Sequence, residues 1–213
     1  DFCLSRGLGD VYKRQPLVAS AVELTRAGPD GPIRVGVLLE GSADGVQSRS
    51  LRMAGLLGKA EVGTEPPAWW PGSPRAAAGE TLIRVSFWVS ALPRVLDAIE
   101  AAADRTDVSP HIAGSAGAGV LYLRAGGPAA AVAGFARALR EGLARDHSGA
   151  VGGERGAVVV LAAPSAVREE LAARDGVNAG MNGAVPGLAL MRAVKDQFDP
   201  GHRMAPGRFP EGS

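Results

Sequence analysis

Leu82-Ile-Arg-Val-Ser-Phe-Trp-Val89 is the stretch that decides the fold of this chain. Its side chains alternate: the odd-numbered ones are all apolar, whereas the even-numbered ones include Arg84 and Ser86. This two-residue period is typical of a β-strand that buries one face. The sequence therefore predicts a strand here whose apolar face meets another layer of the protein.

The residues that follow supply that layer. We expect Ser90 to cap a helix with Pro93 in its first turn, a position at which proline is well tolerated. An apolar stripe at helical spacing then runs along this segment, formed by Leu92, Val95, Leu96 and Ile99. We expect the helix to pack on the sheet through this stripe.

Similar units extend in both directions along the chain. Strands are predicted at 33–39, 110–114, 119–124 and 156–163, and helices at 43–57, 128–145 and 164–171, with Ser42 as the expected N-cap of the first helix. Strands separated by single amphipathic helices indicate an α+β fold. We expect a mixed or antiparallel sheet covered by helices on one face, in a ferredoxin-like arrangement, with a C-terminal helix and an extended tail.

Composition narrows the range of functions. The 213 residues are 46% hydrophobic and 21% charged, and 23 Lys and Arg against 22 Asp and Glu give a net charge of +1. No basic face indicates a nucleic-acid partner. No apolar run approaches the roughly 18 residues of a transmembrane segment. The single cysteine, Cys3, excludes an intrachain disulfide and a cysteine-based zinc site, and a cytoplasmic location fits these features.

Residues 1–15 differ from the rest of the chain. They show neither helical nor strand periodicity, and they contain the only cysteine and one of the two tyrosines. The string resembles translated sequencing-adapter read-through, so we leave it out of the fold prediction and expect the reading frame to have begun within a gene. The alternative is a genuine disordered arm.

The C-terminal stretch 188–209 begins as a helix and then breaks twice. Its apolar stripe consists of Leu190, Met191, Val194 and Phe198. The triplet Asp199-Pro200-Gly201 should end the helix, with the glycine as a left-handed stop, and Ala205-Pro206-Gly207 gives a second break. Between them lies a short segment that contains His202 and suits close approach to a flat or anionic group. A terminal helix with a turn-rich tail is the simpler interpretation.

A family resemblance rests on this stretch. The run Lys195-x-x-Phe198-Asp199-Pro200, followed after five residues by Pro206-Gly207-Arg208, resembles the C-terminal signature of FAD-linked oxidases of the vanillyl-alcohol oxidase/p-cresol methylhydroxylase class. It is most similar to the FAD-binding subunits of glycolate oxidases. The resemblance implies that the segment returns from the cap domain to the FAD domain. The implied cofactor-binding residues are Ala205, Pro206, Gly207 and Arg208. Many relatives carry Asn at the position of Ala205, so here the side-chain amide is missing.

A second resemblance involves the glycines at 114–119. A strand follows them rather than a helix, which argues against a dinucleotide-binding loop. The stretch from Ala116 to Tyr122 is instead similar to an Ala-Gly-Asp-Gly-Asn-Leu-His sequence that related dehydrogenases place beside the flavin. The resemblance implies substrate contacts at Gly117, Gly119 and Tyr122 but no metal, because Tyr122 replaces the histidine. The alternative is that the Tyr122 ring belongs to the core.

Three further groups of residues leave two interpretations open. Trp69 and Trp70 lie in a long irregular connection, where they either anchor the loop by burying apolar area or form a lid over substrate. The strand arginines Arg34, Arg84 and Arg124 either bind a substrate carboxylate or extend into solvent. The histidines are scattered without ligand spacing, so no metal site is expected; they are His111, His147 and His202.

The resemblance implies a function for the whole protein. It predicts an FAD-dependent oxidoreductase that oxidises a 2-hydroxy acid such as glycolate by hydride transfer to flavin. Residues 16–186 would form the substrate or cap domain, and residues 187–213 would return to an FAD domain that precedes this sequence and holds most of the cofactor. The fragment alone should be inactive. Partner subunits would carry electrons onward and could attach the protein to the inner face of the membrane. The alternative is a stand-alone α+β ligand-binding or interaction module without redox activity.

Overall fold

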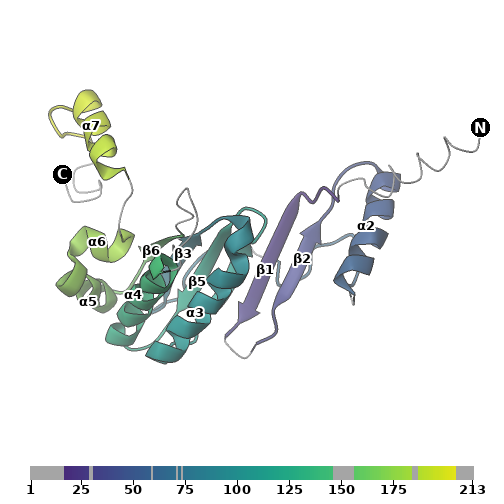
Figure 1. Ribbon diagram of the computed structural model, residues 1–213, viewed down its shortest axis with the longest axis horizontal. Helices are drawn as coiled ribbons and strands as arrows, with labels where there is room; N and C mark the ends of the chain where they lie inside the picture. Colours follow the sequence, from purple (N-terminus) through teal and green to yellow (C-terminus); the bar gives the residue numbers. More distant parts are fainter. Residues whose placement is uncertain are drawn as a thin grey trace, which may run out of the picture. The chain divides into compact units, whose positions relative to one another are not determined.

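The computed structural model describes residues 17–28, 31–58, 60–70, 72, 74–145, 156–183 and 187–204. Strands and helices alternate along these residues (Figure 1), and the fold is α+β, as the sequence predicted. In chain order the elements are β1 Ala21–Ala27, β2 Arg34–Leu38, α2 Ala43–Leu57, β3 Thr81–Ser86, the 3₁₀ turn η1 Val89–Ala91, α3 Leu92–Thr106, β4 His111–Ser115, β5 Val120–Ala125, α4 Ala129–Arg145, β6 Ala157–Ala162, α5 Ser165–Asp175, α6 Val177–Asn182 and α7 Leu188–Phe198.

The strands form one sheet in the order β2-β1-β4-β5-β3-β6. The pairs β1/β4, β4/β5, β5/β3 and β3/β6 are all antiparallel. Two β-α-β units interlock within it: β3-α3-β4 encloses β5, and β5-α4-β6 encloses β3. This is the split β-α-β topology of ferredoxin-like folds, so the predicted arrangement is confirmed.

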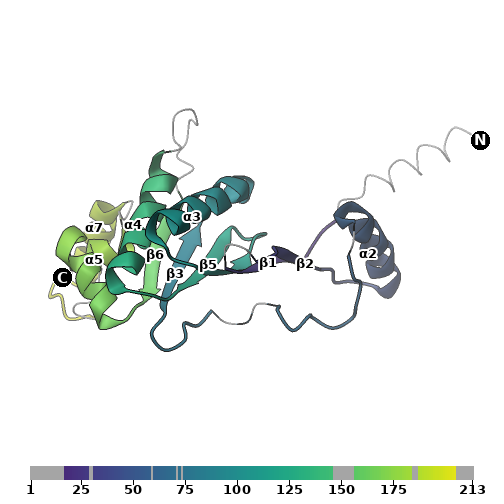
Figure 2. The ribbon, with the colours of Figure 1, turned by 90° about the horizontal axis from the view of Figure 1, so that it is seen from below.

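The core lies between this sheet and the helices α3 and α4, which cover the same face (Figures 1 and 2). Alternate strand residues and the helix stripes meet there, and each of the following side chains is at most 1% exposed: Ile83, Val85, Leu121, Leu123, Val95, Ile99, Val132, Phe135 and Leu139. Burying one such side chain contributes about 1.5–3 kcal/mol. Strand β3 therefore packs through Ile83 and Val85 and the helix after it through its stripe, as their periodicity predicted, but the strand ends at Ser86 and Val89 of the predicted range is 53% exposed.

Two local details differ from the prediction. Strand β1 was missed, because Glu23, Thr25 and Arg26 interrupt its apolar pattern, yet its residues Glu23 to Ala27 pair with β4. Ser90 does not cap α3; it lies within the 3₁₀ turn η1, and Ala91 occupies the N-cap position without a side-chain hydrogen bond. The chain makes this extra turn before Pro93, so the helix begins at Leu92, one residue later than a Ser90 cap would set it.

By its internal contacts the chain divides into two compact units. The smaller unit contains residues up to Val22 together with Gly36–Trp70, and the larger contains Glu23–Val35 and the residues after Trp70. Helix α2 of the smaller unit spans the predicted range 43–57, and Ser42 occupies its N-cap position without a side-chain hydrogen bond. No residue of this helix is buried, and Leu56 is 74% exposed.

Trp69 and Trp70 pack against strand β2 within the smaller unit. A Cβ atom built on Gly36 would lie 2.6 Å from the Trp70 ring and 2.8 Å from the Trp69 ring. The two rings are tilted by 39°, with centroids 6.2 Å apart. The rings therefore rest directly on the backbone of Gly36, which supports the interpretation of this pair as an anchor.

Within the larger unit, Arg140 on α4 forms hydrogen bonds to both strand β6 and helix α6. Its guanidinium donates hydrogen bonds to the carbonyl oxygens of Val158, Gly180 and Met181 at 3.3, 2.9 and 2.9 Å. Burial lowers the pKa of Arg140, and Arg137 lowers it further while Asp175 raises it. A buried guanidinium thus satisfies carbonyl groups at the end of α6 that the helix itself leaves free.

Candidate functional site

Polar side chains gather on the face of the sheet opposite α3 and α4, which we call the open face. Antiparallel register places Arg84 of β3 opposite Tyr122 of β5, and Tyr122 opposite Ala113 of β4. In the next row Arg124 of β5 lies opposite His111 of β4. Because directly opposed side chains have Cβ atoms about 4.5–5.5 Å apart, these residues form one cluster across three strands.

Arg84 lies on the open face without a counter-ion among the described residues. Its Nε atom is buried without a hydrogen-bond partner. Within the described part of the chain, no carboxylate oxygen lies within 4.0 Å of its guanidinium. A covered donor without an acceptor costs free energy, and an anion bound at this guanidinium would recover part of it.

Arg124 differs from Arg84 because it has an acidic neighbour. Its Nη1 atom lies 3.8 Å from Oε2 of Glu80, and the same carboxylate oxygen accepts a 2.8 Å hydrogen bond from the backbone N–H of Ala77. Glu80 is therefore fixed in the turn that precedes β3. The spacing of Glu80 and Arg124 along the chain does not predict this pair, because the pairing register of β3 and β5 brings the two residues together.

His111 completes the cluster as a neutral group. Burial lowers its pKa, and the charge of Arg124 lowers it further, while Glu80 and a backbone hydrogen bond raise it in part. Its Nδ1 atom is buried without a hydrogen-bond partner. At neutral pH His111 therefore adds a polar group to the open face but no positive charge.

The predicted substrate residues Gly117 and Gly119 lie in the tight turn that joins β4 to β5. Gly119 has a φ of 68°, and a Cβ atom there would lie 2.0 Å from the carbonyl oxygen of Phe87. The Gly119 carbonyl also accepts a hydrogen bond from the Phe87 N–H at 2.8 Å. The glycine thus has a structural reason for its place, since it closes the hairpin against β3. Tyr122 lies two strand residues beyond this turn, on the open face.

The C-terminal signature forms a second structured feature around Asp199, which is 7% exposed. Its carboxylate accepts hydrogen bonds from the Lys195 Nζ at 2.7 Å and from the N–H groups of Arg203 and Met204 at 2.9 and 3.0 Å. These hydrogen bonds lower the pKa of Asp199 to about 2. Helix α7 ends at Phe198, as predicted, and the Asp199 carboxylate holds the turn that follows.

Two details of this turn qualify the prediction. The left-handed residue is His202, with φ of 48°, rather than Gly201. Phe198 is 79% exposed, whereas Lys195 and Asp199 form the side-chain hydrogen bonds of the turn. The predicted cofactor-binding residues lie outside the described residues; they are Ala205, Pro206, Gly207 and Arg208.

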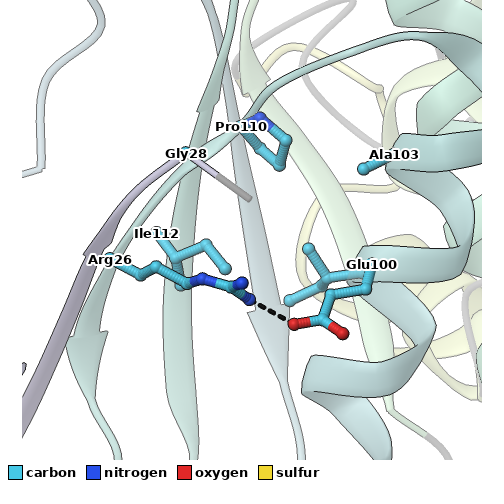
Figure 3. A pocket seen from close by; sticks show the side chains of 7 residues that line it. Arg26, Gly28, Glu100, Ala103, Pro110 and Ile112 are labelled. Atoms are coloured by element: carbon cyan, nitrogen blue, oxygen red, sulfur yellow. Dashed lines mark hydrogen bonds and ion pairs between the residues drawn. The ribbon is translucent and has the colours of Figure 1, made fainter. Parts of the chain in front are cut away.

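A small cavity lies on the other side of the sheet, between β1, β4 and α3 (Figure 3). Arg26 and Glu100 form an ion pair beside it, and Gly28, Pro110 and Ile112 contribute to its wall. Its volume of about 10 Å³ is room for one water molecule, so it cannot hold a substrate. The open face is therefore the better candidate for ligand binding.

The described residues form neither a metal centre nor a membrane-spanning helix. These contain no group of three or more His, Cys, Asp and Glu side chains that could hold a metal ion. None of their helices combines the length and the apolar character needed to cross a membrane. Comparisons with models of protein families, with curated proteins and with solved structures gave no match.

Proposed function

We propose that this chain supplies the cap domain and the C-terminal segment of an FAD-dependent oxidoreductase that oxidises a 2-hydroxy acid such as glycolate. The observation that carries the proposal is the open face, where Arg84 and Tyr122 face each other across β3 and β5. A sheet with helices on one side and an unpaired cation on the other is what a cap needs in order to present an anionic substrate to a cofactor.

The described residues fit the substrate side of such a site. The glycine turn at 116–119 joins two strands and precedes no helix, so it does not offer the helix N-terminus that a pyrophosphate requires. FAD would accordingly be held mainly by another domain, with residues 205–208 close to it. The bound flavin would accept the hydride from the α-carbon of the substrate.

The chain's own residues would bind and orient the acid. The Arg84 guanidinium would pair with the substrate carboxylate through charge-assisted hydrogen bonds. The Tyr122 hydroxyl could donate a hydrogen bond to the same carboxylate or to the 2-hydroxyl group. Fixing both ends of a small acid would leave its α-carbon at a defined position, which is the main contribution of a protein to cofactor chemistry.

The test uses the full-length protein, encoded with the sequence that precedes Pro16 in the source DNA. We expect flavin absorbance in the purified protein and its bleaching when glycolate is added without oxygen. Arg84→Gln should lower kcat/KM by about 10–100-fold through lost carboxylate binding, whereas Arg105→Gln on an exposed helix surface should change it little. A full-length protein without flavin would overturn the proposal.

A stand-alone module that binds a carboxylic acid without redox chemistry is the second candidate, because the open face alone could hold an anion. It predicts a natural start codon near Pro16 and carboxylate binding by a protein that never contains flavin. Partner subunits that take electrons onward, and a cytoplasmic location, belong to the oxidoreductase proposal and are tested by co-purification and cell fractionation.

A further inference from the structure

Two arginines on the open face stand close enough to act on one ligand. Arg84 lies opposite Tyr122, and Arg124 follows Tyr122 by two residues on the same strand and the same face. Diagonal neighbours of this kind are about 7–8 Å apart along an antiparallel pair. If neither guanidinium had an acidic neighbour, such a pair would suit a ligand that has two carboxylates.

Glu80 makes the two arginines unequal. Its carboxylate lies 3.8 Å from Arg124 and is held by the Ala77 N–H at 2.8 Å. No such group accompanies Arg84 among the described residues, where its Nε lacks any hydrogen-bond partner. Among the described residues, the guanidinium of Arg124 therefore has a counter-ion and that of Arg84 has none.

A second carboxylate on the ligand would meet an unfavourable environment. Near Arg124 it would approach the negative charge of Glu80, and like charges at such short range repel each other. His111, the other titratable neighbour of Arg124, is neutral at pH 7 because burial lowers its pKa. It cannot offset that repulsion.

We infer that Glu80 is a specificity residue that restricts the open face to acids with a single carboxylate. The inference rests on the proposed function only in taking the open face as the substrate side of the site. Arg84 binds the carboxylate, and Glu80 acts through Arg124 by cancelling the charge that a second carboxylate would need.

The test measures binding to the 213-residue chain without flavin. Glycolate, with one carboxylate, and malate, with two, are titrated at pH 7 and low ionic strength while the Nε–H signal of Arg84 is followed by NMR. The unchanged chain should bind glycolate more tightly than malate. In Glu80→Gln the amide oxygen can still accept the Ala77 hydrogen bond, and malate binding should strengthen about tenfold relative to glycolate.

The controls separate charge from folding. Glu141→Gln removes the same charge from an exposed ion pair with Arg105 and should leave the glycolate-to-malate ratio unchanged. Arg124→Gln exposes Glu80 to the ligand and should make malate binding weaker still. Circular dichroism checks that each variant is folded. If Glu80→Gln unfolds, the malate affinity of Arg124→Gln still tests the role of Glu80.

The outcomes also distinguish the two proposals. An unchanged ratio in Glu80→Gln, or no shift of the Arg84 signal with either acid, overturns the role of Glu80 even if the full-length protein reduces flavin with glycolate. A ratio that changes as expected, in a protein that never holds flavin, supports the role of Glu80 and counts against the oxidoreductase.

Discussion

The Nζ atom of Lys195 lies 2.7 Å from Oδ2 of Asp199, and the two side chains are only 12% and 8% exposed. The pair closes the last turn of α7 and orients the carboxylate toward the N–H groups of Arg203 and Met204. Two residues of the C-terminal signature therefore hold the backbone that follows the helix. The exposed Phe198 takes no part in this network.

Acid should release this turn. The pKa of Asp199 is lowered from 3.8 to about 2, so the folded turn favours the ionised carboxylate. Its stabilisation is complete well above pH 3.8 and is lost as the pH falls toward 2. The protection factors of the Arg203 and Met204 amides, which correct for the pH dependence of intrinsic exchange, should fall across this window. Asp199→Asn should show low protection factors at both pH 6 and pH 3, and equal protection in the variant and the unchanged chain would contradict the network.

Gly36→Ala should destabilise the smaller unit by about 1–3 kcal/mol, because the new methyl group would overlap the rings of Trp69 and Trp70. The displaced rings should shift the tryptophan fluorescence to longer wavelength. Gly55→Ala is the matched control, since nothing lies within 4 Å of a Cβ there and the position is helical. It should stabilise α2 by up to about 1 kcal/mol. A tolerated Gly36→Ala would mean that the indoles are free to move, as a lid requires.

Gly119→Ala should destabilise the β4–β5 hairpin by more than about 2 kcal/mol. The backbone has φ of 68°, and the added Cβ would overlap the Phe87 carbonyl oxygen. Gly126→Ala serves as the control because its nearest neighbour is the Glu80 side chain at 3.9 Å. Chemical denaturation measures both. If Gly119→Ala kept full stability but lost substrate binding, the glycine would be needed for the ligand rather than for the hairpin.

Arg140→Leu should cost about 3 kcal/mol, because it leaves the carbonyl oxygens of Val158, Gly180 and Met181 without their charged donor. Arg105→Leu removes an exposed arginine that pairs with Glu141 and should cost less than about 1 kcal/mol. Thermal unfolding compares the two variants. Equal losses would show that the buried position of Arg140 adds nothing to its stabilising effect.

Arg84→Met should behave in the opposite way from Arg140→Leu. The buried Nε of Arg84 has no acceptor, so removing it should keep stability unchanged or raise it by about 1 kcal/mol. The same change should abolish the response to glycolate. A large loss of stability would indicate that Arg84 holds the sheet together and is not kept for a ligand.

Periodicity predicted most elements of the fold but not the neighbours within the candidate site. Alternation in 82–89 and the stripe after it identify β3 and α3, because one buried face imposes a regular pattern. Strand β1 was not predicted, because its charged residues interrupt that pattern. Register is set by pairing across long separations, so the approach of Arg84 to Tyr122, and of Glu80 to Arg124, could not be read from spacing.

In the C-terminal stretch, too, the sequence predicted the end of the helix but not the conformation of the residues after it. The break after Phe198 was predictable, since a residue before proline avoids the helical region. The left-handed conformation at His202 was not, because it depends on three hydrogen bonds to one carboxylate. A helix end followed by proline and glycine does not by itself reveal which residue takes the positive φ.

The interlocked strand order also implies an internal pseudo-symmetry. The halves β3-α3-β4 and β5-α4-β6 are related by an approximate two-fold axis through the centre of the sheet, between β3 and β5. Advancing by about 40 residues carries Leu82-Ile-Arg84 onto Tyr122-Leu-Arg124, so each half contributes one arginine to the same face. Glu80 corresponds to the apolar Val120 and breaks the equivalence. The two halves thus carry one cation each on the same face, and Glu80, which lies beside Arg124, makes these two positions chemically different.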